Sequence, residues 1–413
     1  MTRRVVITGL GAFTPVGKNP AEFFENLMAG RSGIGRLDAG FAEKLSIRIA
    51  AQVRDYNPAE HFSKIKPTGI ERFSQLALIA AEQAVKAARL ELAQHELPRA
   101  GVYLGSGMGG ASTLEEGYVE IFQRETPRVK PLSVLLTMGN AAASHLSLAH
   151  HLQGPNVTYS TACSSSAIAI GEAYRQIKDG YADVMLAGGA EAMLTHGAMK
   201  AWEALRTLAL EDANDPAASC KPFSKDRSGL VLGEGAAVLV LENAERAVRR
   251  GARIYAEIAG YDSSSDASHI TKPDAAGQTR AILNALRDAK MQPQDIGYIN
   301  AHGTATLAGD IEETKAIKQV FGEHARRVPI SSTKSMHGHL MGATGAVEFT
   351  VAVLALQHNA IPPTINLHHP DPECDLDYVP NVGRRGVELN AVMSNSFAFG
   401  GSNAVLIAKR FEQ

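Results

Sequence analysis

One cysteine in this chain stands where a nucleophile can be presented. Residues 156–170 begin with a short β-branched run, continue through small residues around Cys163, and enter an Ala- and Ile-rich helical segment. A strand that turns sharply into a helix exposes the residue at the turn, where free backbone N–H groups and the helix dipole stabilise a thiolate. Because many buried cysteines are only structural, the assignment depends on the rest of the chain.

Two histidine motifs in the second half of the chain supply possible partners. His302 lies in Asn-Ala-His-Gly-Thr after an apolar strand, and His339 ends Thr-Lys-Ser-Met-His-Gly-His, which contains Lys334. A thiolate can accept an acyl group, while two neutral imidazoles can donate hydrogen bonds to one carbonyl oxygen and favour an enolate. Lys334 and Glu348 either orient this pair of histidines or form a purely structural ion pair.

A third motif, Asn-Ser-Phe-Ala-Phe-Gly-Gly-Ser-Asn, occupies residues 395–403. In α/β proteins, ligands collect where strands end and loops begin. We therefore expect the three motifs to converge on Cys163.

Metal and nucleotide sites are poorly supported. Histidines are paired at 150/151, 337/339 and 368/369, but no carboxylate or cysteine stands near them at ligand spacing. The glycine-rich segment 9–17, interpreted as a loop after a strand at 4–8, does not complete G-x-G-x-x-G, and Pro15 interrupts the helix that should follow. We predict no metal and no nucleotide.

Composition excludes several classes of function. The chain has 413 residues and a net charge of −2, so it lacks the basic excess that nucleic-acid binding requires. Its three widely spaced cysteines form no disulfide framework, which favours a reducing, cytoplasmic setting. No apolar run approaches the length of a membrane span.

The elements that would position these motifs alternate along the chain. Strands are predicted over 102–104, 182–190, 255–259 and 297–300, and helices near 20–30, 71–90, 139–151, 164–179, 193–206, 277–290, 310–321 and 343–357. This alternation favours an α/β fold with covered sheets. Similar glycine-then-strand segments at 233–241 and 400–408 suggest two related halves, which we place at 1–250 and 251–413.

With these motifs assembled, the sequence resembles the β-ketoacyl-[acyl-carrier-protein] synthases of the elongating synthase II type. The resemblance covers essentially the whole chain and includes Thr-Ala-Cys, Lys-Pro-Phe with Arg227, Gly-Glu-Gly at 233–235 and the three motifs above. It implies a thiolase-type fold, two similar α/β halves stacked as five layers (αβαβα), and usually a dimer.

The resemblance also implies a two-stage reaction. Cys163 would take an acyl chain from carrier protein, with the backbone N–H groups of Cys163 and Phe399 stabilising the oxyanion. His302 and His339 would then assist decarboxylation of malonyl-carrier protein, giving a 3-oxoacyl product and CO2. No cofactor is expected, because the phosphopantetheine of acyl carrier protein carries the substrates.

Further roles follow from matching positions in the family. Phe399 would be the gating residue, with Phe397 supporting it. Residues matched to the pantetheine arm or the acyl pocket are Thr304, Thr306, Met108 and Trp202; ordinary core packing would explain the tryptophan equally well.

Several residues depart from the usual family motifs. The tripeptide Ala-Thr-Leu, which ends at Leu307, stands where the family usually has Ser-Thr-Pro, and His337 replaces a threonine. Ala398 replaces a glycine, and its methyl group would stiffen the loop. These features leave the pathway open between fatty acid synthesis and specialised aryl-polyene or nodulation-type synthesis.

Basic residues and the family resemblance together indicate the partners. The residues matched to carrier docking are Arg206 and, more loosely, Lys64, Lys66, Arg128 and Lys130, which could also be ordinary solvated charges. We expect a homodimer, or a heterodimer with a chain-length-factor-like subunit in which this chain is the catalytic half. Two competing hypotheses are a coenzyme A-dependent thiolase-like enzyme and a non-catalytic subunit; the presence of Cys163 with two histidines argues against both.

Overall fold

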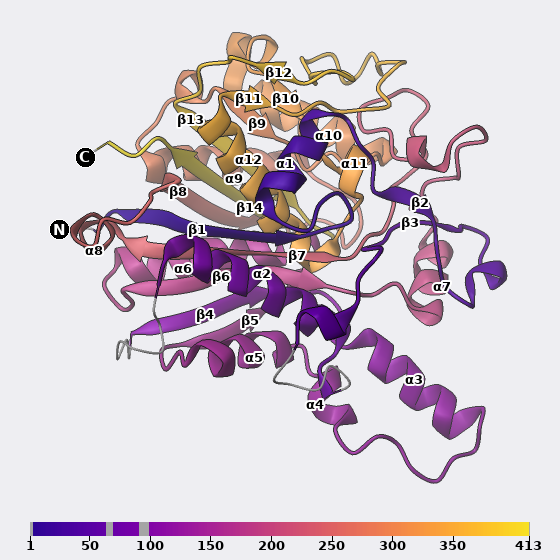
Figure 1. Ribbon diagram of the computed structural model, residues 1–413. Coiled ribbons are helices and arrows are strands. Elements are labelled where there is room, and N and C mark those ends of the chain that lie inside the picture. The colour runs from indigo at the N-terminus through magenta and orange to yellow at the C-terminus, as the bar shows by residue number, and fades with distance from the viewer. Residues whose placement is uncertain (1–2, 63–68, 91–98, 413) are drawn as a thin grey trace.

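The computed structural model describes residues 3–62, 69–90 and 99–412. Its centre is a ten-stranded sheet in the order β10-β9-β13-β14-β8-β1-β7-β6-β4-β5 (Figure 1). The strands before residue 250 are β1 (Val5–Phe13), β4 (Ala100–Gly105), β5 (Asn156–Tyr159), β6 (Val184–Glu191) and β7 (Gly235–Asn243). Those after it are β8 (Ala256–Ser265), β9 (Tyr298–Asn300), β10 (Ile330–Ser331), β13 (Ala391–Phe397) and β14 (Ser402–Lys409).

The two groups of strands have the same topology. In the first, β5, β4 and β6 are parallel, and β7 and β1 follow as antiparallel neighbours. In the second, β10, β9 and β13 are parallel, and β14 and β8 follow in the same way. Residues 5–7 of β1 pair with residues 256–258 of β8 and join the groups. The predicted similarity of the two halves is confirmed.

Helices cover both groups of strands and fill the space between them. The longer helices are α1 (Pro20–Met28), α2 (Arg72–Ala88), α3 (Ala111–Phe122), α5 (Ala141–His150), α6 (Ser165–Lys178), α7 (His196–Leu205), α9 (Ala275–Ala289), α10 (Leu307–Phe321) and α12 (Thr344–His358). The short elements are α4 (Ser133–Thr137), α8 (Ala244–Arg249), α11 (Lys334–His337), β2 (Ile34–Arg36), β3 (Ile49–Ala51), β11 (Ala360–Ile361) and β12 (Arg384–Arg385).

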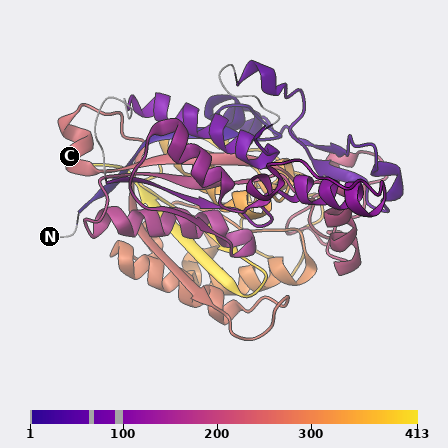
Figure 2. The ribbon, with the colours of Figure 1, turned by 90° about the horizontal axis from the view of Figure 1, so that it is seen from below.

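Three clusters of buried apolar side chains define the layers. One joins α2 and α5 to the first strands, one joins α6 and α12 to both groups of strands, and one joins α9 and α10 to the second strands. Helix α12 is buried from Thr344 to Leu356, as expected for a helix packed on every side. The view from below shows the same succession of helices and sheet (Figure 2), and the predicted five-layer α/β fold is confirmed.

The prediction of a glycine-rich loop at 9–17 is wrong for its first residues. Strand β1 continues to Phe13, because Gly9 and Gly11 lie against helix α2. A Cβ on Gly11 would come within 1.8 Å of the carbonyl oxygen of Ala80. The glycines therefore let a helix backbone pack closely on the strand. Helices α3 and α4 are not among the elements expected from the sequence, and no helix in the described part of the chain is long and apolar enough to cross a membrane.

Candidate active site

Cys163 lies in the middle of the one-turn 3-10 helix Ala162–Ser164, between the end of β5 and the start of α6. Ala162 has a left-handed φ of 52°, which an alanine adopts only when its surroundings impose it. The Ser165 hydroxyl accepts a bond from Thr161 N (2.8 Å) and donates to Ala162 O (2.7 Å). These two bonds hold the sharp turn that places the cysteine.

The side chain of Cys163 is almost fully buried, with 4% of the residue exposed. Burial raises the pKa of the Cys163 thiol to about 11, while the backbone N–H groups of Phe399 and Cys163 and the nearby Lys334 act to lower it. The expected donors are therefore present, and desolvation opposes the stabilisation that they give to the thiolate. Both N–H groups are directed at the Cys163 sulfur, so an oxyanion formed on an acyl group at this sulfur would lie near the same donors.

The ring of His302 is oriented by the ammonium group of Lys334. Lys334 Nζ contacts Glu348 Oε1 at 2.6 Å, His302 Nδ1 at 3.3 Å and the carbonyl oxygen of His302. An ammonium has three protons and no lone pair, so these three acceptors use all of them. His302 Nδ1 is then an acceptor, and the proton of the neutral ring is on Nε2.

The ring of His339 is held in the same tautomer by a different set of contacts. Its Nδ1 accepts a hydrogen bond from Met341 N at 3.0 Å and lies 3.0 Å from the hydroxyl of Thr344. Because a backbone N–H can only donate, Nδ1 carries no proton. The Nε2–H of His339 is buried and has no hydrogen-bond partner among the described residues, so it is available to a substrate.

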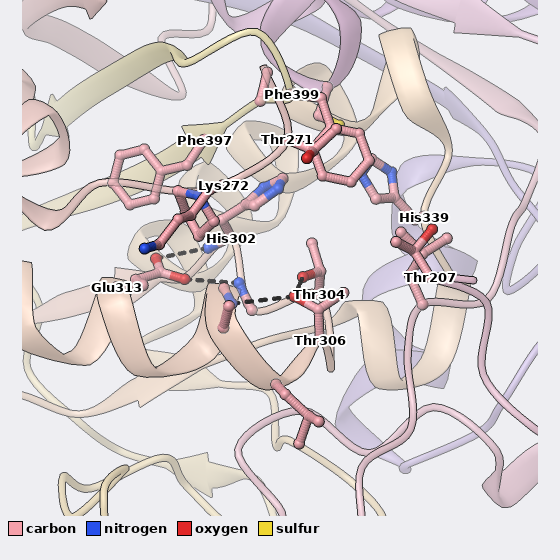
Figure 3. Close-up of a pocket in the computed structure, with 18 of the residues that line it drawn as sticks. Thr207, Thr271, Lys272, His302, Thr304, Thr306, Glu313, His339, Phe397 and Phe399 are labelled. Atoms are coloured by element: carbon pink, nitrogen blue, oxygen red, sulfur yellow. Dashed lines mark hydrogen bonds between the residues drawn. The ribbon is translucent and has the colours of Figure 1, made fainter. Parts of the chain in front are cut away.

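These side chains converge on one cavity of about 280 Å³. Its lining includes Cys163, His302 and His339, and one ligand-type atom of each lies within 4.8 Å of the other two. The two imidazole rings are perpendicular, with centroids 5.5 Å apart. Figure 3 shows both rings directed toward the region of Phe399. The three atoms could also ligate a metal ion, and the absence of a metal stays a prediction.

Both imidazoles are neutral at ordinary pH. Burial lowers the pKa of His302 well below 6.5, and the charge of Lys334 and the neighbouring His339 lower it further. Burial and Lys334 do the same to the pKa of His339. Burial raises the pKa of the Glu348 carboxyl, and the ammonium of Lys334 opposes that rise. The two histidines are thus arranged to donate hydrogen bonds to a developing anion.

Glu313 and Asp310 are two buried carboxylates that the sequence interpretation missed. Glu313 accepts the backbone N–H groups of His302 (2.8 Å) and Gly303 (2.7 Å), and Asp310 accepts that of Ala305 (3.1 Å). Both belong to α10 and hold the loop that carries His302, and Figure 3 shows Glu313 beside His302. Their position in the helix that follows the motif is the one signal that could have indicated them.

Glu191 is a third buried carboxylate that the sequence interpretation missed. Its oxygens accept the backbone N–H groups of Gly107 (2.6 Å), Met108 (3.1 Å) and Gly342 (3.0 Å). Gly342 follows the His339 motif, whereas Gly107 and Met108 belong to the loop after β4. This carboxylate therefore ties the second glycine-rich loop to the segment of His339.

The residues matched to substrate contacts lie in two groups, a first group that lines the cavity and a second group that lies outside its lining. Thr304, Thr306, Phe397 and Phe399 line the cavity. Trp202 is outside the lining but stacks on Phe399, with centroids 6.0 Å apart and an angle of 23°. Two residues of the first group, Thr304 and Thr306, share a hydroxyl contact of 2.9 Å.

Met108 lies outside the cavity lining, and about half of it is exposed. The structure therefore does not bring Met108 together with the other predicted substrate contacts, although Glu191 ties its loop to the segment of His339.

The predicted docking residues are dispersed over the surface. Arg206 is exposed and lines the mouth of the cavity, where it caps the C-terminus of α7 with φ 58°. Arg128 and Lys130 are exposed between α3 and α4, and Lys130 pairs with Glu116 at 2.6 Å. Lys64 and Lys66 lie outside the described residues.

Comparison with known proteins identifies the family. The model of "Beta-ketoacyl synthase, N-terminal domain" matches residues 2–247, and that of "Beta-ketoacyl synthase, C-terminal domain" matches residues 255–368. The chain belongs to the β-ketoacyl synthase family. It is 42% identical over 412 residues to 3-oxoacyl-[acyl-carrier-protein] synthase 2 of Staphylococcus aureus (strain COL), covering 99% of each chain. The corresponding protein of Synechocystis sp. (strain ATCC 27184 / PCC 6803 / Kazusa) is 40% identical, with the same coverage.

Solved structures agree with this placement. A β-ketoacyl synthase from Burkholderia phymatum STM815 has a TM-score of 0.92 and 37% identity, covering 99% of this chain and 100% of that one. The ishigamide ketosynthase/chain length factor has a TM-score of 0.92. A type II polyketide acyl-carrier protein in complex with its ketosynthase has a TM-score of 0.91. Both of these are 33% identical to the chain, with full coverage of both chains.

The neutral state of His302 and His339 can be tested by NMR of histidine-labelled protein. A group whose pKa is lowered takes up its proton only after the pH has fallen through the lowered value. We expect both ring signals to stay constant from pH 8 to about 5.5, whereas the denatured chain titrates near 6.5. Single histidine variants assign the signals, and a midpoint near 6.5 for either ring would contradict the description.

Proposed function

We propose that the protein catalyses decarboxylative condensation of an acyl chain, held on Cys163, with malonyl-acyl carrier protein. The observation that carries this proposal is the convergence of one thiol and two neutral imidazoles in a single buried cavity. The names of the relatives, which are 3-oxoacyl-[acyl-carrier-protein] synthases, support the choice of carrier protein as the substrate donor.

In the first half-reaction, the sulfur of Cys163 attacks the thioester carbonyl of the acyl-carrier protein. The carbonyl oxygen becomes an oxyanion that the N–H groups of Cys163 and Phe399 stabilise. The carrier thiol leaves with the proton that the cysteine gives up, and the acyl chain remains as a thioester on Cys163. Nucleophilic catalysis of this kind divides one condensation into two easier steps.

In the second half-reaction, malonyl-carrier protein occupies the same cavity. The Nε2–H groups of His302 and His339 donate to its thioester oxygen. The electron pair that stays on the substrate when CO2 departs is therefore stabilised as an enolate. The enolate carbon attacks the acyl thioester, Cys163 leaves, and the product is a 3-oxoacyl-carrier protein two carbons longer. Neutral imidazoles suit this step because they donate hydrogen bonds without a proton transfer.

Lys334 and Glu348 act through His302 in this scheme. The ammonium fixes the Nδ1 of His302 as an acceptor, which directs its proton to the substrate side. Thr304 and Thr306 line the same cavity as the two histidines (Figure 3) and would contact the pantetheine arm. Phe399 would gate the cysteine, with Trp202 stacked on it and Phe397 beside His302. No resident cofactor or metal is required by these steps.

A second copy of the chain fits the edge of the sheet beyond β5. Asn156 and Val157 of this terminal strand are exposed. Exposed apolar residues lie on the α3–α4 segment, in which α4 contacts α5, the helix packed on β5: Leu114, Tyr118, Ile121, Phe122, Leu132, Val134, Leu135 and Met138. An unpaired edge beside an apolar surface is typical of an interface, and two β5 strands can pair about a twofold axis.

A second possible assembly is a heterodimer with a chain-length-factor-like subunit, in which this chain supplies the cysteine. The similarity to the ishigamide ketosynthase/chain length factor supports this heterodimer as the second candidate. We also propose that the chain divides into halves at residue 250, which falls between the two matched family segments.

The first test is the site of acylation. Incubation with acyl-carrier protein followed by intact mass analysis should show one acyl adduct, which Cys163→Ala abolishes. Cys220→Ala and Cys374→Ala are matched controls that should retain the adduct, because both thiols lie outside the cavity lining. An adduct that persists in Cys163→Ala would remove the proposed nucleophile.

A second test addresses docking of the carrier protein at Arg206. Because rim charges act mainly on association, Arg206→Glu should raise the KM for carrier-bound substrate about fivefold or more and leave small thioester analogues unaffected. Arg287→Glu, on the exposed side of α9, is the control and should change neither. An equal effect of Arg206→Glu on both substrates would exclude a docking role.

A further inference from the structure

His337 is a buried histidine that the mechanism above does not use. It is the last residue of α11, two positions before His339, and it is fully buried without lining the cavity. Its ring lies 6.2 Å from that of Phe23, on the side of α1. A polar ring in this interior must have its hydrogen bonds satisfied, and its two nitrogens are both partnered.

The contacts of His337 determine its protonation state. Nδ1 lies 2.7 Å from the carbonyl oxygen of Gly338, and Nε2 lies 2.9 Å from the hydroxyl of Thr333. A carbonyl only accepts, so Nδ1 carries the proton. Burial and the charge of Lys334 lower the pKa of His337 to about 3, so the ring is neutral. Its Nε2 then accepts a hydrogen bond from the hydroxyl of Thr333.

The bond to Gly338 holds the peptide group that enters His339. The C=O of Gly338 and the N–H of His339 belong to one planar unit. His337 Nδ1–H binds its oxygen, and Val231 O accepts its N–H at 2.7 Å. The same planar group is therefore fixed from both edges, directly before the Cα of the histidine that faces the cavity.

Gly338 has no side chain, and its backbone N–H donates to the carbonyl oxygen of Lys334 at 3.0 Å. Its φ is +69°, and a Cβ would come within 2.8 Å of the Cβ of Ala51 and 3.0 Å of Val231 O. Glycine adopts this conformation without the strain that a side chain would add. The hydrogen bond from His337 thus fixes the carbonyl group of a residue that has no side chain with which to do so.

The hydroxyl of Thr333 continues the chain of hydrogen bonds toward the other histidine motif. Asn300 Nδ2 lies 3.4 Å from Thr333 Oγ1 and 3.0 Å from the hydroxyl of Tyr298, and all of these side chains are buried. Asn300 stands two residues before His302. One buried series, from Asn300 through Thr333 and His337 to Gly338, connects the segments that carry both imidazoles.

We propose that His337 is a positioning residue that sets the orientation of His339 through the Gly338–His339 peptide. This rests on the proposed function, in which His339 serves the malonyl half-reaction and Cys163 alone takes the acyl chain. Loss of the His337 contacts should therefore slow decarboxylation selectively. A purely structural side chain would instead lower stability and affect both half-reactions together.

The experiment compares two substitutions in the full-length protein. His337→Leu removes both polar contacts at similar volume, whereas His337→Asn keeps a donor at the position of Nδ1. Transfer of the acyl chain to Cys163 is followed by intact mass, and CO2 release from malonyl-carrier protein is followed with enzyme that is already acylated. Thermal unfolding of each variant reports on folding.

With His337→Leu we expect CO2 release to fall about tenfold to a hundredfold, as for a misplaced catalytic group, and acyl transfer to stay within about twofold. His337→Asn should recover most of the decarboxylation. A folded leucine variant with normal CO2 release, or an equal fall of both half-reactions, would overturn the proposal.

Thr333→Val provides a second variant if the leucine variant does not fold. It leaves the ring of His337 in place and removes only its hydroxyl partner, so a severalfold selective fall in CO2 release is expected, and unchanged CO2 release would overturn the proposal. Failure of the unmodified protein to perform either half-reaction would instead count against the proposed function and would be seen before any variant is compared.

Discussion

The site depends on a lysine ammonium placed in the interior of the protein. Lys334 and Glu348 are at most 1% exposed and form an ion pair at 2.6 Å. Removing one partner of such a pair typically costs about 3–5 kcal/mol, because the other charge is left buried and unpaired. The ion pair joins α11 to α12. The two remaining protons of the Lys334 ammonium are directed at Nδ1 and the carbonyl oxygen of His302. The position of Lys334 thereby orients the imidazole of His302, and its charge adds to the burial that lowers the pKa of both histidines.

Buried carboxylates hold the loops of the site in a common way. Glu313 and Asp310 collect backbone N–H groups of the His302 loop, and Glu191 collects those of two glycine-rich segments. Burial raises the pKa of each of these groups, to about 7 for Glu191 and Asp310, while the N–H donors oppose the rise. Loops without regular structure are thus given the rigidity that a preorganised oxyanion or enolate site needs.

Much of this arrangement could be predicted from the sequence because its signals are local. Cys163 stands at a recognisable strand-to-helix turn, and His302 and His339 lie in motifs of unusual composition, so their meeting at strand ends followed from an α/β fold. The motifs also carried the resemblance to the family, and that resemblance implied the five layers. The extent of β1 could not be predicted in this way, because Gly9 and Gly11 look like a turn until helix α2 is seen lying on them.

The missed carboxylates have a similar explanation. A glutamate in an amphipathic helix such as α10 is usually a solvated residue, and only tertiary packing shows that Glu313 faces the backbone of His302. The strand-to-helix turn indicates donors that stabilise the Cys163 thiolate, whereas the burial that raises the pKa of the thiol depends on neighbours remote in sequence. Local patterns indicated the groups that we propose to react, whereas long-range packing sets the electrostatics of these groups.

The central claim is that one cavity joins an acyl chain on Cys163 to a carbanion that His302 and His339 stabilise. The most direct measurement supplies purified protein with an acyl-carrier protein and malonyl-carrier protein labelled with 13C at the methylene carbon, and analyses the products by mass spectrometry. The account predicts a labelled 3-oxoacyl-carrier protein two carbons longer than the starting chain, with one CO2 released for each product. Release of free fatty acid without carbon–carbon bond formation, or recovery of unchanged malonyl-carrier protein, would contradict it.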